Sequence, residues 1–416
     1  MTAPPLSPYA SLRVPNFRRY VFAVVAMTLA TMIQGTIVGW QIYELTHDVL
    51  ALGLIGLAEA LPYIAASLLA GHVADRYDRR LVAISALAVV CASAVALLVL
   101  PSMLHDSPTV LVRAIFAVIV ASGFARSFLL PARQALGAEV VPRELFANSV
   151  TWRSGAWQLA AVIGPALGGA LYAIGGTRLA YSVDAILVVV GIVALAMVRR
   201  TPLQPSRPTE SIGTSLVAGV RFVFGERIVL GALSLDLFSV LFGGATALLP
   251  VYAAEVLHVG PQGLGLLRSA PAIGAVVTST VLAHSKPFQR TGQMLLRSVA
   301  IFGVTIVVFG LSTSFPLAVA ALALGGAADM VSVFVRSTLL TTRTPPEMLG
   351  RVMSVNGIFV GSSNEIGAFE SGVTARWLGA VPSVVLGGVL TLVVVAVTAW
   401  RNPTLRSLET MEPPPR

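Results

Sequence analysis

The sequence from residue 71 to residue 80 reads Gly71-His-Val-Ala-Asp75-Arg76-Tyr-Asp78-Arg79-Arg80, and it separates two long apolar runs. The runs cover about residues 50–73 and 82–101, and each is long enough to cross a hydrocarbon core about 30 Å thick as a helix. A short basic loop between two such runs predicts two membrane-spanning helices whose connection faces the cytoplasm.

Apolar runs of this length recur along almost the whole chain. Hydrophobic residues make up 56% of the sequence and charged residues only 11%, compared with roughly 25% in ordinary soluble domains. The runs lack the apolar/polar alternation of barrel strands, and backbone groups in lipid must be satisfied within a helix or a closed barrel. We therefore predict an all-α integral membrane protein with twelve transmembrane helices, at about residues 20–43, 50–73, 82–101, 110–131, 149–174, 180–198, 228–253, 263–284, 294–312, 316–337, 352–375 and 381–400.

The cations lie between these runs, so the formal net charge of +9 does not indicate nucleic-acid binding. Almost all of them fall on one side of the predicted spans, and the other side receives only Arg113, Arg178, Arg268 and Arg376. By the positive-inside rule the first side is cytoplasmic. We expect both termini to face the cytoplasm.

The chain divides into two halves that resemble one another. Arg126-Ser-Phe-Leu-Leu near the end of the fourth predicted span recurs as Arg336-Ser-Thr-Leu-Leu near the end of the tenth, and each is followed by a loop with proline and glutamate. Such a repeat indicates duplication, and in transporters the substrate site lies between the repeats. The predicted parts are two six-helix bundles at residues 1–198 and 228–400, a cytoplasmic linker at 199–227 with an amphipathic stretch at 215–224, and a cytoplasmic tail at 401–416.

The loop quoted above resembles the signature loop of the major facilitator superfamily, in which glycine usually stands where this chain has Asp78. The resemblance implies the major facilitator fold, with two pseudo-symmetric six-helix bundles and a monomeric transporter. It also implies that the loop holds one access state and does not bind substrate, although a positive-inside loop with an incidental acid is the alternative. The residues assigned to this conformational gate are Gly71, Asp75, Arg76, Arg79 and Arg80.

Two further motifs resemble particular branches of the superfamily. Gly164-Pro165-Ala-Leu-Gly168-Gly169 is similar to the glycine-proline motif of helix 5 in its exporters, with close helix packing as the alternative. Pro131-Ala-Arg133-Gln134 and the stretch from Asn364 to Gly372 resemble the branch that contains bacterial enterobactin exporters and related efflux proteins. The resemblance implies export.

Ionisable residues within membrane spans are costly and therefore mark functional sites. Because burial favours the protonated form of a carboxyl group, such an acid can carry a proton across and exchange it for substrate. Asp236 and Glu365 are the first choices for this role, and Asp184 lies nearer a membrane face. The full set of proton-coupling candidates is Asp236, Glu365, Asp329, Glu59 and Glu370. For Asp329 an ion pair with Arg336, seven residues further along the same helical face, is an equal alternative.

Uncharged polar side chains and two arginines are candidates for lining the substrate cavity. Hydrogen bonds between helices are the alternative role for the glutamines of the first span, and snorkelling to the interface is the alternative for the arginines. The candidates are Gln34, Gln41, Trp40, Arg126, Arg336 and Asn364.

The sequence lacks the chemistry of other membrane protein classes. It contains no phosphate-binding loop, its five histidines are scattered, and Cys91 is its single cysteine. We therefore expect neither an enzyme nor an ATP-driven pump, and no cofactor or metal.

Together these features predict a proton-coupled secondary exporter in a bacterial cytoplasmic membrane. Its partners would be protons, the lipid bilayer and a small amphiphilic molecule, either a drug-like compound or a siderophore. Two alternatives remain open: an importer or facilitator on the same fold, and a membrane scaffold or sensor that transports nothing.

Overall fold

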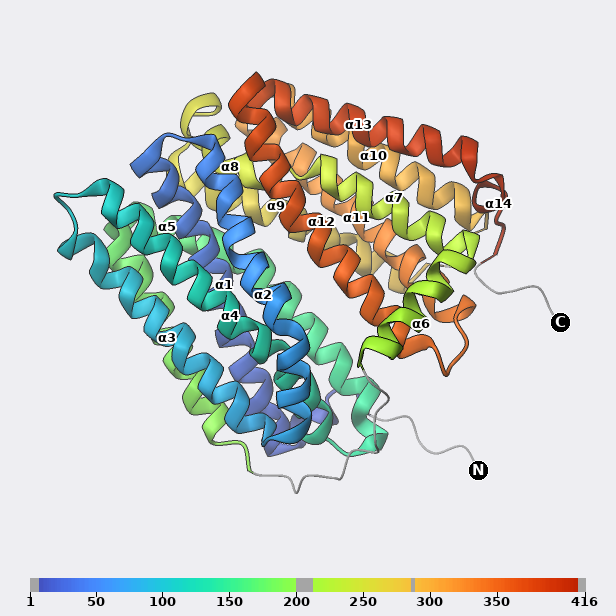
Figure 1. Ribbon diagram of the computed structural model, residues 1–416, viewed down its shortest axis with the longest axis horizontal. Coiled ribbons are helices and arrows are strands. Elements are labelled where there is room, and N and C mark those ends of the chain that lie inside the picture. Colours follow the sequence, from blue (N-terminus) through green and yellow to red (C-terminus); the bar gives the residue numbers. More distant parts are fainter. Residues whose placement is uncertain (1–6, 200–211, 286–288, 411–416) are drawn as a thin grey trace. The chain divides into compact units, whose positions relative to one another are not determined.

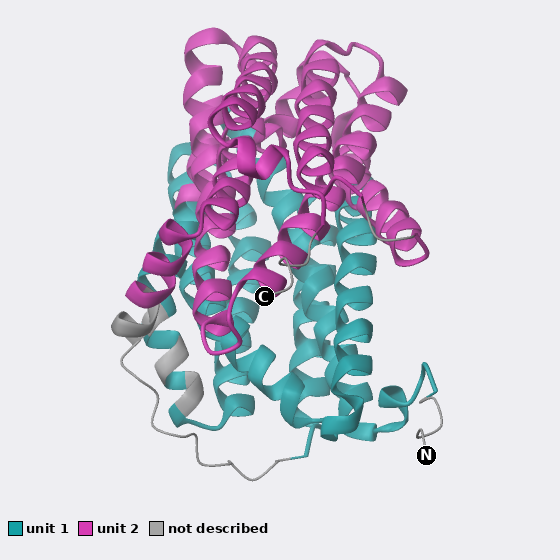
Figure 2. Cartoon of the chain, turned by 90° about the vertical axis from the view of Figure 1, so that its right-hand side faces the viewer, with its two compact units in different colours: residues 1–46, 58–207 teal, residues 47–57, 208–416 magenta. Residues whose placement is uncertain are grey.

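The computed structural model describes residues 7–199, 212–285 and 289–410, and helices dominate this part of the chain (Figure 1). Two compact units are distinguished in Figure 2: residues 1–46 with 58–207, and residues 47–57 with 208–416. The first unit holds α1 (Pro15–Thr46), most of α2 (Val49–Arg76), α3 (Arg79–Met103), α4 (Pro108–Glu139) and α5 (Phe146–Ala196). The second holds α6 (Ile212–Gly225), α7 (Arg227–Gly243), α8 (Leu249–Val251), α9 (Gly260–Ala283), α10 (Thr291–Leu311), α11 (Phe315–Arg343), α12 (Leu349–Leu378), α13 (Ala380–Arg401) and α14 (Pro403–Arg406).

All twelve predicted spans coincide with helical segments of the described chain. Two of them share α5, which is interrupted at Gly175 and Gly176, where Gly176 has a φ of 61° that a residue with a Cβ rarely adopts. Ten helices of the described chain are long and apolar enough to cross a membrane, and the stretch 143–196 that contains both halves of α5 is one of them. The polar residues of α12 keep that 30-residue helix out of the ten.

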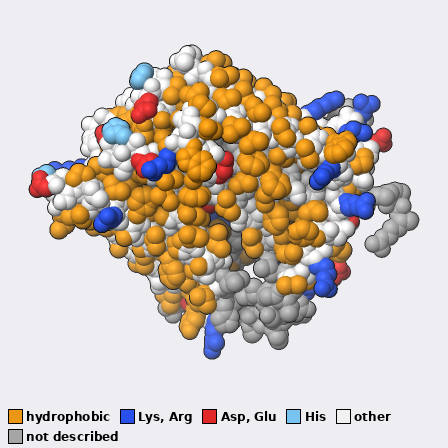
Figure 3. Space-filling view, turned by 45° about the horizontal axis from the view of Figure 1, so that its top comes forward, with side chains coloured by type: hydrophobic (Ala, Val, Ile, Leu, Met, Phe, Trp, Pro, Cys, Tyr) orange, Lys and Arg blue, Asp and Glu red, His pale blue; other side chains and the backbone are white. Residues whose placement is uncertain are grey.

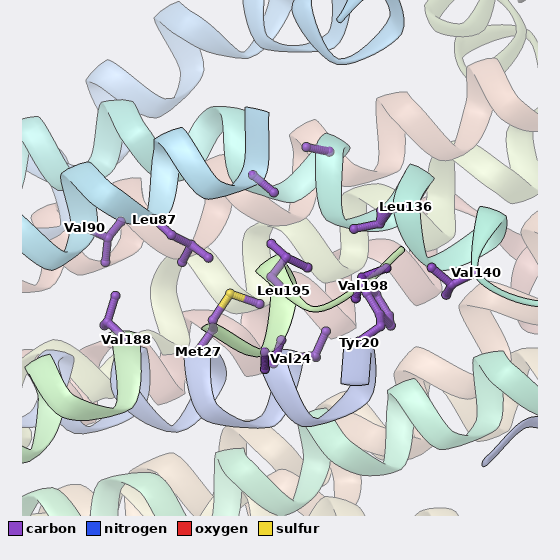
Figure 4. Close-up of a cluster of buried hydrophobic side chains, with 14 of the residues drawn as sticks. Tyr20, Val24, Met27, Leu87, Val90, Leu136, Val140, Val188, Leu195 and Val198 are labelled. Atoms are coloured by element: carbon purple, nitrogen blue, oxygen red, sulfur yellow. The ribbon is translucent and has the colours of Figure 1, made fainter. Parts of the chain in front are cut away.

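The first unit is held together by an apolar core between α1, α3, α4 and the second half of α5 (Figure 4). Tyr20 and Met27 of α1 pack there with Leu87 of α3, Leu136 of α4 and Leu195 of α5, all of them buried. Three helices are thus fixed around the segment of α1 that leads to Gln34.

The outer surface is apolar as well. In the face drawn in Figure 3, hydrophobic side chains cover most of the area and the charged residues are few. Large apolar side chains such as Leu69, Ile174 and Trp400 are 64%, 75% and 77% exposed. Such a surface suits contact with lipid and not with water.

The first residues of α2 belong to the second unit, where they pack against α12. A Cβ placed on Gly53 would lie 3.0 Å from the carbonyl oxygen of Ala368, so the two helices approach closely at a glycine. The carboxylate of Asp48 lies 3.4 Å from the Arg376 guanidinium. These contacts explain why residues 47–57 group with the second unit, although the predicted bundle at 1–198 included them.

Two other segments of the second unit differ from a simple helix pattern. The predicted linker at 199–227 contains α6, whose Val223 packs in a core cluster with α7, α11 and α12 residues. The predicted span at 228–253 is broken after Gly243, where a 3-10 turn at Ala245–Leu248, the short α8 and a π-helical turn at Tyr252–Val256 replace a continuous helix. Interrupted helices of this kind are typical of transporter sites.

Candidate functional site

Arg126 of α4 is at the centre of a polar cluster in the first unit. Its Nη1 forms an ion pair with the Glu59 carboxylate of α2, and its Nη2 donates a hydrogen bond of 2.5 Å to Oε1 of Gln34 on α1. The Arg126 side chain is 17% exposed. Its guanidinium is thus held by side chains of two neighbouring helices, and α4 continues beyond it to Glu139.

Gln34 extends this cluster to a second carboxyl group. Its Nε2 donates a hydrogen bond of 3.2 Å to Oδ2 of Asp184, which lies in the second half of α5 and is 1% exposed. One continuous network, Glu59–Arg126–Gln34–Asp184, joins four helices of the unit. We refer to these four residues as the α4 cluster.

The second unit contains a related arrangement around Arg336 of α11. Arg336 forms an ion pair with Asp236 of α7, and both residues are only 6% exposed. Asp329 lines the same small pocket as Asp236 and forms no hydrogen bond or ion pair within the described residues. The structure thus pairs Arg336 with Asp236 and not with Asp329. We refer to Arg336, Asp236 and Asp329 as the α11 cluster.

The sequence repeat around the two arginines is longer than the five residues first noted. Ser122-Gly-Phe-Ala-Arg126-Ser-Phe-Leu-Leu corresponds to Ser332-Val-Phe-Val-Arg336-Ser-Thr-Leu-Leu. The hydroxyl groups of Ser122 and Ser332 are buried without a hydrogen-bond partner in the described chain. Each repeat therefore supplies one arginine and a serine one turn before it, and two carboxyl groups from outside the repeat complete the cluster of each unit.

The acids of α12 lie elsewhere in the second unit. A Cβ on Gly56 would lie 2.8 Å from Oε2 of Glu365, so this carboxylate packs against the start of α2. Glu370 is partly buried. Asn364 is exposed, and its amide donates to the Val360 carbonyl of its own helix.

The remaining polar candidates on α1 make contacts within the first unit. Oε1 of Gln41 accepts a hydrogen bond of 2.6 Å from the buried Tyr181 hydroxyl, which assigns Gln41 a role between helices. The Trp40 ring packs edge-on against Tyr172, with the ring centroids 6.5 Å apart.

The signature loop joins α2 to α3. The Asp78 carboxylate accepts hydrogen bonds from the backbone N–H groups of Arg80 and Leu81 and so caps the N-terminus of α3, which explains an aspartate where the superfamily usually has glycine. Arg79 pairs with Glu139 at the end of α4, and Arg80 donates to the Ala196 carbonyl at the end of α5. Arg76 is exposed, whereas the surroundings of Gly71 and of the Asp75 side chain are not among the described features.

The glycine-proline motif of α5 packs against α1. A Cβ on Gly164 would lie 2.5 Å from the Met32 Cβ, and one on Gly168 would lie 3.1 Å from the Ile33 carbonyl oxygen. Pro165 and Gly169 are buried beside them. The motif therefore lets α1 and the first half of α5 approach closely beside Gln34.

The model of the transmembrane secretion effector family matches residues 6–415 of the chain. The chain belongs to this family of major facilitator superfamily transporters. Its curated relatives include the enterobactin exporter EntS of Citrobacter koseri, which is 30% identical over 404 residues and covers 94% of each chain. The enterobactin exporter EntS of Shigella flexneri is 29% identical over 403 residues, covering 93% of this chain and 94% of the relative.

Solved structures of other transporters share the major facilitator fold. A mutant of the peptide transporter POT superposes with a TM-score of 0.74 at 14% identity, covering 95% of each chain. The nucleoside transporter NupG gives a TM-score of 0.70 at 14% identity, covering 93% of this chain and 99% of that one. This major facilitator protein is therefore a multi-pass transporter of a bacterial cytoplasmic membrane and not an enzyme.

Asp184 is the residue of the site that was not among the sequence candidates. Residue 184 stands near the start of the predicted sixth span, so it was expected nearer a membrane face. The signal that could have identified it is the presence of both a carboxylate and a tyrosine, Tyr181, in an otherwise apolar run. Within the described residues, no group of three histidine, cysteine or acidic side chains is placed to hold a metal ion.

Proposed function

We propose that this transporter is a proton-coupled exporter that carries a small amphiphilic molecule, a siderophore or a drug-like compound, by alternating access. Membership of the family and the names of its enterobactin-exporting relatives support export of such a molecule. The glycine-proline motif on α5 agrees with the exporter branch. The protein would act as a monomer, with the six-helix units alternating around the substrate.

The observation that carries the coupling proposal is the charge balance of the two clusters. In each unit one arginine, the partly buried Arg126 or the buried Arg336, is matched by one carboxylate, Glu59 or Asp236, and a second carboxyl group remains, Asp184 or Asp329. A buried carboxylate without a cation costs several kcal/mol unless another positive charge compensates it, and the smallest such charge is a proton. Asp184 and Asp329 are therefore our first choices for proton carriers.

Gln34 would couple protonation of Asp184 to the hydrogen bond between α1 and α4. Its amide oxygen accepts from Arg126 while its amide nitrogen donates to the Asp184 carboxylate. Once Asp184 carries a proton, its O–H becomes a donor, and the Gln34 amide satisfies it best by turning its oxygen toward Asp184. The amide nitrogen then faces the Arg126 guanidinium, donor against donor, and the bond between α1 and α4 is lost.

The other acids and polar groups have supporting parts in this scheme. Glu59 and Asp236 would release their arginines when the clusters rearrange, so that Arg126 and Arg336 meet an anionic group of the substrate. On α12, Glu365 and Glu370 would be further proton-coupling groups, and the exposed Asn364 would line the substrate cavity. Trp40 would contact the apolar body of the substrate, and the arginines of the signature loop would hold one access state.

Transport into inverted membrane vesicles tests this function. We expect a catecholate siderophore or members of a panel of fluorescent drugs to accumulate when a pH gradient, acid inside, is imposed, and accumulation to stop when a protonophore collapses it. Asp184→Asn and Asp329→Asn should abolish this accumulation. The matched control is Asp106→Asn, which changes an exposed aspartate outside the clusters.

Accumulation that tolerates both the protonophore and the two substitutions would instead identify a facilitator. Substrate movement only from the opposite face would identify an importer. If no compound moves in any direction while the protein is folded and inserted, transport of this substrate class is contradicted.

A further inference from the structure

A second polar site lies in the first unit, apart from the α4 cluster. It is a pocket of about 390 Å³ formed by α1, α4 and the first half of α5. None of the α4 cluster residues lines it. Its lining includes Tyr20, Arg133, Arg153, Ser154, Trp157 and Gln158.

Two guanidinium groups share this pocket without an acid. In the described part of the chain, neither the Arg133 nor the Arg153 guanidinium forms a hydrogen bond or an ion pair. Three other partly buried arginines of this unit, Arg79, Arg80 and Arg126, each have such a bond, as Arg126 does with Glu59. Two like charges in one partly buried pocket repel each other, so the pocket is suited to an anion.

The local structure holds both arginines in place. The Tyr20 hydroxyl donates a hydrogen bond of 2.8 Å to the Arg133 backbone carbonyl, and Cζ of Arg153 lies 6.0 Å from the Tyr20 ring centroid. Gly137 makes this arrangement possible, because a Cβ there would lie 2.6 Å from the Tyr20 hydroxyl and 3.0 Å from Nη1 of Arg153. The site is thus built from residues of three helices.

The remaining walls favour a planar apolar group. Trp157 is 48% exposed and lines the pocket with Val24, Val150 and the Tyr20 ring. Ser154 and Gln158 add hydrogen-bonding groups on the same side of α5. A guanidinium pair beside aromatic rings can bind an anionic group and stack its attached ring at the same time.

We propose that this pocket binds an aromatic anion, with the anionic group on Arg133 and Arg153 and the ring against Trp157. The inference rests on the proposed function, since this pocket would be an additional binding site for the exported molecule. It narrows the substrate class to aromatic compounds with a carboxylate or a comparable acidic group. A lipid phosphate has the same anionic chemistry without the ring, so the test includes both.

Calorimetric titration of the full-length protein in phosphatidylcholine nanodiscs tests the site with three probes that share one ring. The probes are 1-naphthoate, the neutral 1-naphthalenemethanol and the cationic 1-naphthylmethylammonium. We expect 1-naphthoate to bind the wild-type protein at least about 10-fold more tightly than the other two, because charge-assisted hydrogen bonds are strong. This comparison needs no variant, so it stands even where a substitution impairs folding.

Substitutions then locate the binding. Arg133→Gln and Arg153→Gln should each weaken 1-naphthoate binding about 10-fold or more. Lysine at either position should recover part of the affinity, because the charge remains and the planar fork is lost. Arg143→Gln, at an exposed arginine outside the pocket, should leave the affinity unchanged.

Equal binding of 1-naphthoate and 1-naphthalenemethanol, or indifference to both glutamine substitutions, would overturn the proposal. Displacement of 1-naphthoate by sn-glycerol 3-phosphate at lower concentrations than 1-naphthoate itself requires would assign the pocket to lipid headgroups instead. Because these titrations use no pH gradient, their failure is separate from failure of proton-coupled export, which the vesicle experiment measures.

Discussion

Arg126 of α4 and Arg336 of α11 occupy equivalent positions of the two sequence repeats, and each forms an ion pair with a carboxylate from another helix of its own unit. The pairing with Glu59 and Asp236 leaves one further carboxyl group in each cluster. Duplication explains the equivalent arginines, whereas the acids come from different helices in the two units, so each unit places two acids near its arginine from different positions.

Removing only one partner of the Asp236–Arg336 ion pair should destabilise the protein. Arg336→Gln leaves a buried carboxylate without its cation, which costs about 3–5 kcal/mol. The double variant Asp236→Asn with Arg336→Gln should lie closer to the wild-type protein. Unfolding in mixed micelles titrated with sodium dodecyl sulfate measures these free energies, and Arg297→Gln, at an exposed arginine, is the control.

Gln34 and Gln41 lie on the same helix but should behave differently. Gln34→Leu breaks the link between Asp184 and Arg126, and we expect gradient-driven accumulation in vesicles to fall about 10-fold or more, the effect of losing a charge-assisted hydrogen bond. Gln41→Leu removes only the bond to Tyr181, so it should cost about 1 kcal/mol of stability and leave accumulation in place. Equal transport by the two variants would contradict the relay.

Two glycines of α5 provide a matched test of helix packing. Gly164→Ala places a methyl group against Met32, and we expect it to destabilise the protein by about 1–3 kcal/mol. Gly155→Ala meets no atom within 4 Å and should stabilise the protein by about 0.5–1 kcal/mol, because alanine favours the helix. Thermal unfolding of both variants measures the difference, and a similar melting temperature for the two would disprove close packing at Gly164.

The cap at Asp78 predicts which residues the signature loop tolerates. Asp78→Ala removes the acceptor for the first N–H groups of α3 and should cost about 0.5–2 kcal/mol, whereas Asp78→Gly, the usual superfamily residue, should restore most of that loss. Amide hydrogen exchange at the start of α3 is the readout. Faster exchange in the glycine variant than in the alanine variant would be the opposite of this expectation.

The helices could be predicted from the sequence because their signal is local. Apolar runs of about 20 residues determine a span regardless of what they pack against, and the Gly175–Gly176 break separated two spans as expected. The interruption after Gly243 was not predicted, because a 3-10 turn and a π-helical turn keep the same apolar composition as a continuous helix. The grouping of residues 47–57 with α12 depends on contacts at Gly53 that hydropathy does not encode.

The candidate site was predictable in its residue types and only partly in its pairings. Glu59, Asp236 and both arginines stand out because charges are rare in spans, yet the partners of Arg126 come from positions 34 and 59, and nothing in one sequence relates them. Asp329 and Arg336 share a helical face, which made a local ion pair an equal alternative to proton coupling, but Asp236 on α7 is the partner of Arg336. Asp184 stood outside the coupling candidates because its position in the sequence placed it nearer a membrane face.

Separation of exchange from accumulation tests proton coupling most directly. In proteoliposomes, labelled substrate exchanged for unlabelled substrate without a gradient requires only alternating access, whereas accumulation under a pH gradient also requires a proton carrier. We predict that Asp184→Asn and Asp329→Asn keep exchange and lose accumulation, because asparagine has nearly the same shape as aspartate, still offers Gln34 an acceptor oxygen at position 184, and cannot ionise. Accumulation at the wild-type level in both variants would contradict the assignment of these two acids as the proton carriers.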